Sequence, residues 1–334
     1  LLNGKAKIIM ADYKKMEGFS DEEFNSLVNP VNRELINDFL RQSQLSPQTL
    51  KQYKSALYIF AKWVHDELGN KDIPKMKVRD GLNYQNYLID LELSDSAIKF
   101  KRSVVSSMFT FIEAFWDDEY PNCRNIFTKA VPTVGNQKKK EKNPLTKKEL
   151  EKLIKELVKL QEWQKLAYLM FSYSTGCRRE EARQLRKEVI TYDKFKNAKG
   201  EEKNYFVTHE IRAKGKGKAG KVRKFQFDDD TMEALKRWVK ERGEDDCEHM
   251  FVTKRDGKYK QVSAETFNDW CKLFGDIVGK PVHPHLSRSS RATILAVEDG
   301  KDIKGIQKLL GHSSSSTTEI YIVNDSEESF DDLF

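Results

Sequence analysis

Four short segments in the second half of the chain carry polar residues whose types and spacing can act on a phosphate group. Each segment supplies arginine, lysine, histidine or tyrosine, and none has the cysteine and histidine spacing of a metal site. Such a set can bind an anion and transfer protons without a metal ion. The candidates are Arg178 and Glu181, then Lys214, Lys216 and Lys218, then His285 and Arg288, and finally His312 and Tyr321.

The chemistry that these groups support together is attack of a tyrosine on a phosphodiester. The crowded phosphorane carries extra negative charge, which two arginines and histidine donors can stabilise. Arginine suits this task because its fork donates two parallel hydrogen bonds and stays charged at any working pH. The departing 5′ oxygen needs a proton, which a lysine on a hairpin can deliver. Each residue alone also has a structural interpretation: Arg178 in an ion pair, His285 as a helix cap, Tyr321 in a core.

The glycine-rich segment Gly215–Lys221 (GKGKAGK) satisfies most of a nucleotide-binding P-loop pattern. However, Val222 stands where a serine or threonine should bind magnesium, and the residues that follow have a strand pattern. A P-loop must instead lead into a helix. The sequence therefore argues against nucleotide binding.

The elements that must position the candidates form a mainly helical domain that begins at about Leu145. Thr146-Lys-Lys-Glu149 is a capping box that opens an amphipathic helix. Arg178 and Glu181 lie three residues apart, so on a helix the carboxylate can hold the guanidinium. Strand character is confined to residues 189–227, where two β-forming segments flank the glycine-rich turn. This pattern predicts a hairpin that carries the three candidate lysines.

The first half of the chain, residues 26–135, reads as a separate helical domain. One helix begins at Ser46-Pro47 and another at about Ser94, each with an apolar stripe; the second stripe is expected to run from Ala97 through Val104 to Phe115. The opposite faces carry polar residues that can contact DNA or remain solvated. They are Thr49, Lys51, Lys54, Lys99 and Arg102.

Charge favours a polyanionic partner. The formal net charge is +7, but residues 136–224 alone hold 26 Lys and Arg against 12 Asp and Glu. Clustered cations gain free energy by displacing counterions from phosphates. The four cysteines show no paired spacing, which predicts reduced thiols, and no apolar run is long enough for a membrane span. We expect a cytoplasmic protein, for which a nucleic acid would be a suitable partner.

Three of the segments resemble the motifs of the tyrosine recombinases, the family of lambda-type phage integrases, Cre and the Xer proteins. The matching strings are TGxRxxE at Thr175–Glu181, HxxR with Ala-Thr at His285–Thr293, and LLGHSSxxTTxxY at Leu309–Tyr321. They occur in the family's order, and the last is the most specific. The resemblance covers about residues 145–323.

The resemblance implies that Arg178 and Arg288 clamp the scissile phosphate, with Glu181 supporting Arg178. Tyr321 would attack, leaving a 3′-phosphotyrosine and a free 5′ hydroxyl, and strands would exchange through a Holliday junction. Arg179 stands beside Arg178, but the Gly-x-Arg-x-x-Glu spacing selects Arg178.

The remaining catalytic positions follow from the same resemblance. His285 falls on a proton-transfer position, and His312 would donate to a phosphate oxygen. We expect Lys214 to protonate the leaving oxygen; alignment backward from Arg223 favours Lys218 instead, and Lys216 lies between them. No cofactor and no metal is implied.

The implied architecture is α+β, mainly α with a small β-hairpin, arranged as a two-domain C-shaped clamp on DNA. Residues 1–25 would be an extension, 26–135 a helical core-binding (SAM-like) domain, 136–144 a basic linker, 145–323 the catalytic domain and 324–334 a tail that docks on a neighbouring protomer. Lys138, Lys139 and Lys140 of the linker would cross the DNA backbone.

The implied partners are double-stranded DNA with a specific recombination site and other copies of the chain, as a tetramer on two sites. Accessory factors that bend DNA or set direction are compatible with integration or excision of a mobile element. Three alternatives share some of these features: a type IB topoisomerase, a telomere-resolving enzyme, and a DNA-binding protein that has lost catalysis.

Overall fold

The computed structural model describes residues 17–128, 130–135, 143–213 and 221–311. The chain divides into two compact units, residues 1–139 and 140–334, which are described separately below. No helix in the described part of the chain combines the length and apolar character that crossing a bilayer requires. The expected lysines of the linker and hairpin, His312, Tyr321 and the tail lie outside the described residues.

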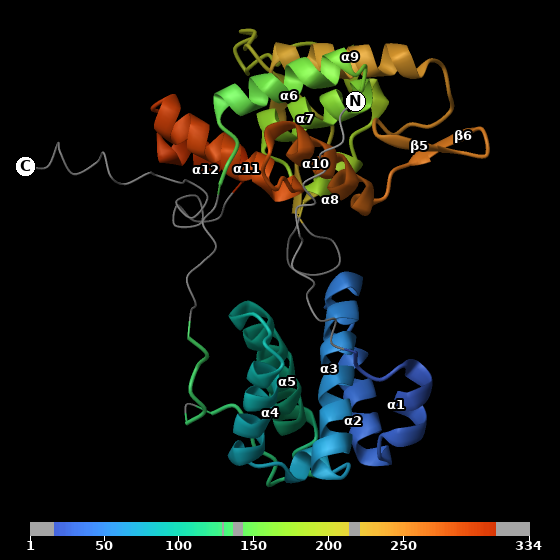
Figure 1. Cartoon of the computed structure of the whole chain (residues 1–334), viewed down its shortest axis with the longest axis vertical. Coiled ribbons are helices and arrows are strands. Elements are labelled where there is room, and N and C mark those ends of the chain that lie inside the picture. The colour runs from blue at the N-terminus through green and yellow to red at the C-terminus, as the bar shows by residue number, and fades with distance from the viewer. Residues whose placement is uncertain (1–16, 129, 136–142, 214–220, 312–334) are drawn as a thin grey trace, which may run out of the picture. The chain divides into compact units, whose positions relative to one another are not determined.

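The first unit is built from helices, as predicted (Figure 1). Two of them begin at the predicted serine caps: Ser46 Oγ accepts the Thr49 N–H at 3.1 Å, and Ser94 Oγ accepts the Ala97 N–H at 3.4 Å. The bounds are α1 Asp21–Leu27, α2 Pro30–Leu40, α3 Pro47–Leu68, the 3-10 turn η1 Ile73–Lys75, α4 Val78–Asp90 and α5 Asp95–Phe115.

The apolar face of α5 differs from the expected stripe. Val104 is buried as expected, but Phe115 is 73% exposed, and Ile98 and Ile112 are buried instead. The reason is that α5 packs against α2, α3 and α4, so it buries a wider face, rotated from the one expected.

The second unit is helical around a central α7 (Trp163–Thr175), which packs against its neighbours α6, α9 and α11 (Figure 1). The predicted capping box opens α6: Thr146 Oγ1 accepts the Glu149 N–H at 3.2 Å. The remaining helical elements are α6 Lys147–Lys159, α8 Arg179–Arg183, η2 Lys187–Thr191, α9 Asp229–Arg242, α10 Ala264–Val278, α11 Pro284–Thr293, the π-helical η3 Ile294–Glu298 and α12 Ile303–Leu310.

The predicted hairpin is present as two short antiparallel ladders. Strand β2 (Ile211–Ala213) pairs with β3 (Lys221–Arg223), and β1 (Phe206–Val207) pairs with β4 (Gln226–Phe227). The expected strand character at Val189 is wrong, because that residue lies in the 3-10 turn η2, where its side chain enters the core.

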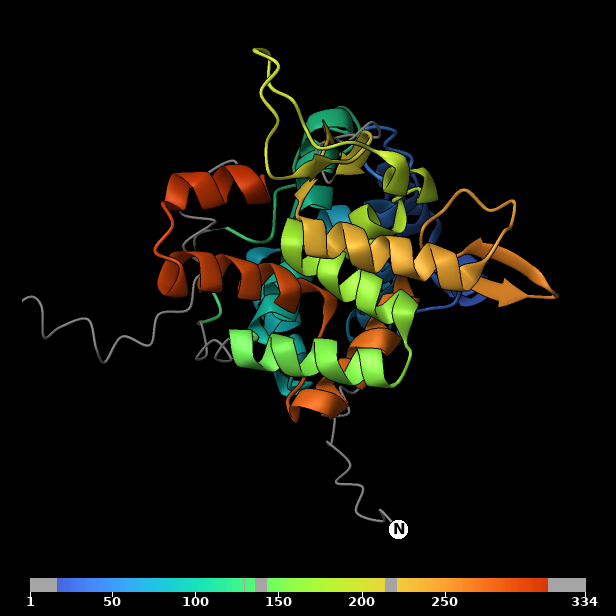
Figure 2. The same ribbon diagram turned by 90° about the horizontal axis from the view of Figure 1, so that it is seen from above.

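A second hairpin was not predicted. Strand β5 (Val252–Arg255) pairs with β6 (Lys258–Gln261), and the pair projects from the unit in both views (Figures 1 and 2). Asp256 and Gly257 form its turn with positive φ values of 51° and 76°. An Asp-Gly pair is a strong local hairpin signal, and it was present in the sequence.

Candidate active site

Arg178 and Glu181 are joined at the start of α8. Gly176 ends α7 in the left-handed region, at φ 58°, and the chain then turns so that Arg178 is the N-cap of α8. The Glu181 carboxylate accepts the Arg178 backbone N–H at 2.7 Å and the guanidinium Nη1 at 3.0 Å. Glu181 is buried while Arg178 is partly exposed. The guanidinium is therefore held by a buried carboxylate and remains accessible to an anion.

Arg288, on α11, is fully buried beside the same turn. Its Nη1 donates to the Gly176 carbonyl at 2.7 Å, and its Nη2 donates to the Leu310 carbonyl at 2.5 Å. A Cβ at Gly176 would overlap the Leu310 side chain, so this position requires glycine for both its φ and its packing. Arg288 thus connects the turn before Arg178 to the last residue of α12.

His285 lies in the first turn of α11, three residues before Arg288. Desolvation lowers the pKa of His285, and the neighbouring cations, including Arg178 and Arg288, lower it further. The imidazole is therefore neutral at neutral pH and can accept a proton.

A third arginine of this region, Arg223, was not identified as a functional residue from the sequence. It ends β3, and its guanidinium donates to the carbonyls of Leu309 at 2.6 Å and Leu310 at 2.7 Å. It also lies over the Phe225 ring, 4.2 Å from the centroid. Only its position in a strand after a glycine-rich turn was visible in the sequence, because its partners are more than 80 residues away.

Three arginines thus meet around two chain turns. Arg178 and Arg288 flank the turn at Gly176, while Arg223 and Arg288 both donate to the Leu310 carbonyl. Residues 311–321, which include His312 and Tyr321, follow Leu310 directly in the sequence. The described part of the site is therefore a cluster of three arginines, in which Arg288 is buried and Arg178 is partly exposed, so that Arg178 can meet an anion.

In the first unit, Thr49, Lys54 and Arg102, which are candidate DNA contacts, already have partners within the chain. Lys54 pairs with Asp21 at 2.6 Å, and the Thr49 hydroxyl lies 2.8 Å from Ser46 Oγ at the helix cap. Arg102 donates to the Gln85 side chain and to the Pro132 carbonyl. These contacts limit what the three side chains can offer to DNA.

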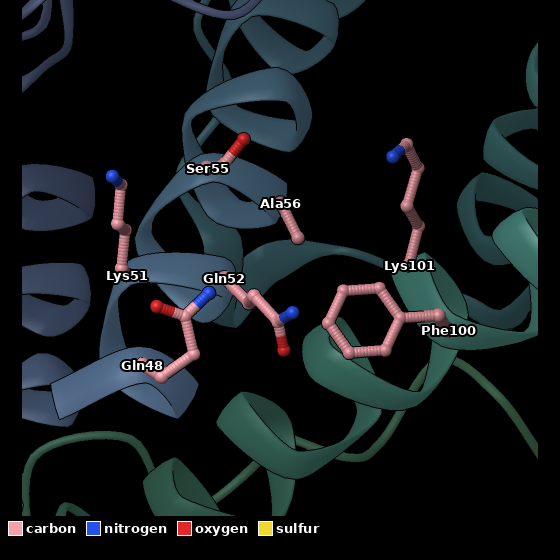
Figure 3. Close-up of a pocket in the computed structure, with 7 residues that line it drawn as sticks. All are labelled: Gln48, Lys51, Gln52, Ser55, Ala56, Phe100 and Lys101. Atoms are coloured by element: carbon pink, nitrogen blue, oxygen red, sulfur yellow. The ribbon is translucent and has the colours of Figure 1, made fainter. Parts of the chain in front are cut away.

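A groove between α3 and α5 presents other polar groups (Figure 3). Gln48, Lys51, Gln52 and Ser55 share one exposed face of α3, at helical spacing. Lys101 of α5 lies on the opposite wall, and desolvation lowers its pKa. The sequence analysis identified only Lys51 of this set. The missed signal was the i, i+3, i+4, i+7 spacing of the polar residues on α3.

An arginine held by a buried carboxylate, and a second arginine three residues after a histidine on α11, form the arrangement expected for a tyrosine recombinase. The mainly helical fold also agrees with that class of enzyme. The sequence model of the phage integrase family matches residues 143–328, more than half of the chain. The chain belongs to this family and is a site-specific DNA recombinase.

Known proteins resemble the chain over most of its length. The SPbeta prophage-derived recombinase-like protein YomM of Bacillus subtilis is 31% identical over 313 residues, 92% of either chain. Tyrosine recombinase XerC of Oceanobacillus iheyensis is 27% identical over 84% of this chain and 87% of its own.

Solved structures share the fold. The Tn1549 transposon integrase in complex with transposon right end DNA superposes with a TM-score of 0.66, at 18% identity, covering 90% of this chain and 97% of that one. The XerH recombinase bound to a palindromic difH substrate gives 0.64, at 19% identity, with 92% and 97% covered.

Proposed function

We propose that this recombinase cleaves and rejoins double-stranded DNA at a specific site through a covalent 3′-phosphotyrosine at Tyr321. The observation that carries the proposal is the convergence of Arg178 and Arg288 on the turn at Gly176, with Glu181 holding the first and two backbone carbonyls holding the second. Two fixed guanidiniums can donate hydrogen bonds to the nonbridging oxygens of one phosphate. These hydrogen bonds strengthen as negative charge builds up on the phosphate in the transition state.

The roles of the other residues follow from the bonds that must change. The Tyr321 oxygen forms a bond to phosphorus while the bond from phosphorus to the 5′ oxygen breaks. His285, whose lowered pKa keeps it neutral, takes the phenol proton. A hairpin lysine, Lys214 in preference to Lys216 or Lys218, gives a proton to the 5′ oxygen, and His312 donates to a phosphate oxygen. Rejoining runs these transfers in reverse.

In the first unit, we assign DNA contact to the groove between α3 and α5. Gln48 and Gln52 extend from α3 between two lysines, Lys51 and Lys101 (Figure 3). A glutamine amide pairs with adenine in the major groove, whereas lysine suits phosphate or guanine. The groove can therefore supply both affinity and base preference, with Lys99 and the linker lysines Lys138, Lys139 and Lys140 adding phosphate contacts. Relatives solved with bound DNA support this choice of partner.

Assembly as a tetramer on two DNA sites is part of the proposal, with residues 26–135 and 145–323 as core-binding and catalytic domains. The tail 324–334 is acidic but ends in Phe, Leu and Phe residues, so it fits docking on a neighbouring protomer. Deleting residues 325–334 should weaken higher assembly on DNA in gel shifts while single-site binding persists. Unchanged assembly would contradict the role of the tail.

The decisive experiment is a search for the covalent intermediate. The protein is incubated, with EDTA, against a library of nicked duplexes, and denaturing gels are used to detect protein-DNA adducts. We expect an adduct in the wild type and none in Tyr321→Phe, and the trapped DNA would reveal the target sequence. DNA retention without any adduct in the wild type would refute the catalytic proposal and favour a binding-only protein.

A further inference from the structure

The β2–β3 hairpin is fastened at its base on both strands. On β3, Arg223 donates to the Leu309 and Leu310 carbonyls of α12 at 2.6 and 2.7 Å. On β2, the Gln184 side chain brackets Arg212: its Nε2 donates to the Arg212 carbonyl at 3.0 Å, and its Oε1 accepts the Arg212 N–H at 3.1 Å. Gln184 is the C-cap of α8, the helix that begins at Arg178. Both strands are thus tied to elements of the candidate active site.

The Arg223 contact has the features of a specific link. The last carbonyls of a helix lack partners within the helix and carry partial negative charge, so a guanidinium there is stabilised by hydrogen bonds and by the helix dipole. Gly311, at φ 66°, lies against the guanidinium, and a Cβ at that position would overlap it. Burial lowers the pKa of Arg223. An arginine stays charged despite such a shift, so the link persists at any working pH.

The link also reaches the second phosphate-binding arginine. Arg223 and Arg288 donate to the same Leu310 carbonyl, at 2.7 and 2.5 Å. Only seven residues, 214–220, separate the paired ends of β2 and β3, where Ala213 faces Lys221. All three candidate lysines fall within this short segment of the sequence, and β2 and β3 fix the two points at which it is attached.

We propose that Arg223 is a positioning residue that holds the β2–β3 hairpin against the end of α12, and thereby places the lysine that protonates the leaving 5′ oxygen. This inference rests on the proposed function. In the step concerned, the bond between phosphorus and the 5′ oxygen breaks, and a proton passes from the lysine ammonium to that oxygen. In this proposal Arg223 acts through the hairpin and takes no part in the proton transfer.

The test compares two substrates that differ only in the leaving atom. A duplex with a 5′ bridging sulfur releases a thiolate, which needs no proton because thiols have a pKa of about 8.5. With the ordinary oxygen substrate, we expect Arg223→Ala to form the phosphotyrosine adduct about 10- to 100-fold more slowly, since small misplacements of a reacting group have effects of that size. With the sulfur substrate, the rate should return to within about threefold of the wild type.

Two further variants separate positioning from folding. Arg223→Lys keeps the charge but loses the two-pronged donation, so its rate should lie between those of the wild type and Arg223→Ala. Gln184→Ala removes the fastening of β2, and it should show the same recovery with sulfur. Arg223→Ala and Gln184→Ala each remove the contacts of one strand of the hairpin. The test therefore does not depend on a single variant that could fail to fold.

A matched control is available in the same unit. Arg242 is also buried and donates to backbone carbonyls, at 2.5 Å to His249 and 2.8 Å to Cys247, but these lie between α9 and β5. Arg242→Ala should lower the melting temperature without making the adduct rate depend on the leaving atom. All variants are compared at saturating DNA, with binding measured separately.

The outcomes are distinct. Equal rates for Arg223→Ala and the wild type, or equal slowing on the oxygen and sulfur substrates, would overturn the positioning role. The positioning role would be supported if Arg223→Ala and Gln184→Ala slowed adduct formation on the oxygen substrate and the sulfur substrate restored the rate, while Arg242→Ala showed no such dependence on the leaving atom. If the wild type formed no adduct on either substrate, the proposed function would fail instead.

Discussion

Glu181 holds Arg178 at two points, since its carboxylate accepts both the backbone N–H and the guanidinium of that residue, at 2.7 and 3.0 Å. The buried carboxylate thus fixes the start of α8 and the direction of the arginine together. Positioning of the guanidinium, rather than its mere presence, is therefore the property that substitution of Glu181 should change.

Glu181→Gln should slow phosphotyrosine formation about 10-fold. The substitution keeps the shape but removes the charge, and charge-assisted hydrogen bonds contribute about 1.5–3 kcal/mol. The measurement is the single-turnover adduct rate on nicked DNA. The control is Glu180→Gln, because Glu180 is exposed and pairs with Arg183 at 3.1 Å. A rate for Glu181→Gln equal to that of the control would remove the supporting role.

Gly176→Ala should reduce both stability and activity. A non-glycine residue in the left-handed region costs about 1–3 kcal/mol, and here the new methyl would also displace Leu310, whose carbonyl holds Arg288. The measurements are the free energy of unfolding in urea and the adduct rate. Gly200→Ala is the matched control, because Gly200 has φ 80° and open space at its Cβ position. If both variants lost equal stability and neither lost activity, the packing argument would be wrong.

Activity should fall in acid because His285 must be neutral to accept the phenol proton. Desolvation and neighbouring cations lower its pKa in the folded chain below the ordinary histidine value of about 6.5. The same shift affects stability. Below about pH 6.5 the histidine of the unfolded chain takes up a proton before that of the folded chain does, so the free energy of unfolding is highest above that pH. It declines as the pH falls toward the lowered pKa of the folded chain. We expect His285→Gln to flatten this decline and to abolish the acid limb of the adduct rate.

His209→Gln separates the two effects. Desolvation also lowers the pKa of His209, whose Nε2 lies 3.2 Å from the Gln184 carbonyl. This variant should flatten the stability profile as well, yet it should leave the acid limb of the adduct rate in place. An acid limb that survived in His285→Gln would assign the proton transfer to another group.

Local signals predicted the helices well. Ser46, Ser94 and Thr146 each accept an amide of the first turn, because a cap depends on residues within three positions along the chain. The pairing of Arg178 with Glu181 was also local, although the structure makes Arg178 the N-cap of α8 rather than a residue within it.

Contacts between segments far apart in the sequence could not be predicted from such local signals. Arg223 meets carbonyls of Leu309 and Leu310, and a backbone carbonyl leaves no mark in the residue type that carries it. Phe115 was expected on the buried face, but which side of α5 is buried depends on three other helices. Lys54 and Arg102 looked like free cations because their partners, Asp21 and Gln85, lie in other helices.

The partners of these cations lead to a prediction about DNA binding by the groove between α3 and α5. Lys101→Ala should lower the slope of log affinity against log salt by about 1, since each phosphate contact releases about 0.9 counterion. Lys54→Ala should change it less, because Lys54 is paired with Asp21 at 2.6 Å. The measurement is the affinity for the target DNA sequence, identified by the adduct experiment, at a series of salt concentrations. Equal slopes for the two variants would contradict this distinction.

Gln52→Ala tests the base-reading part of the same groove. Gln52 is exposed on α3, and its side chain lines this groove together with Phe100 of α5 (Figure 3). Loss of a two-point contact to adenine should weaken binding to the target by about 1–3 kcal/mol, with a relaxed preference at one base pair and an unchanged salt slope. Selection from randomised duplexes measures that preference, and Ser103→Ala, an exposed substitution elsewhere on α5, is the control. A uniform loss over all sequences would instead indicate that Gln52 contacts the phosphate backbone.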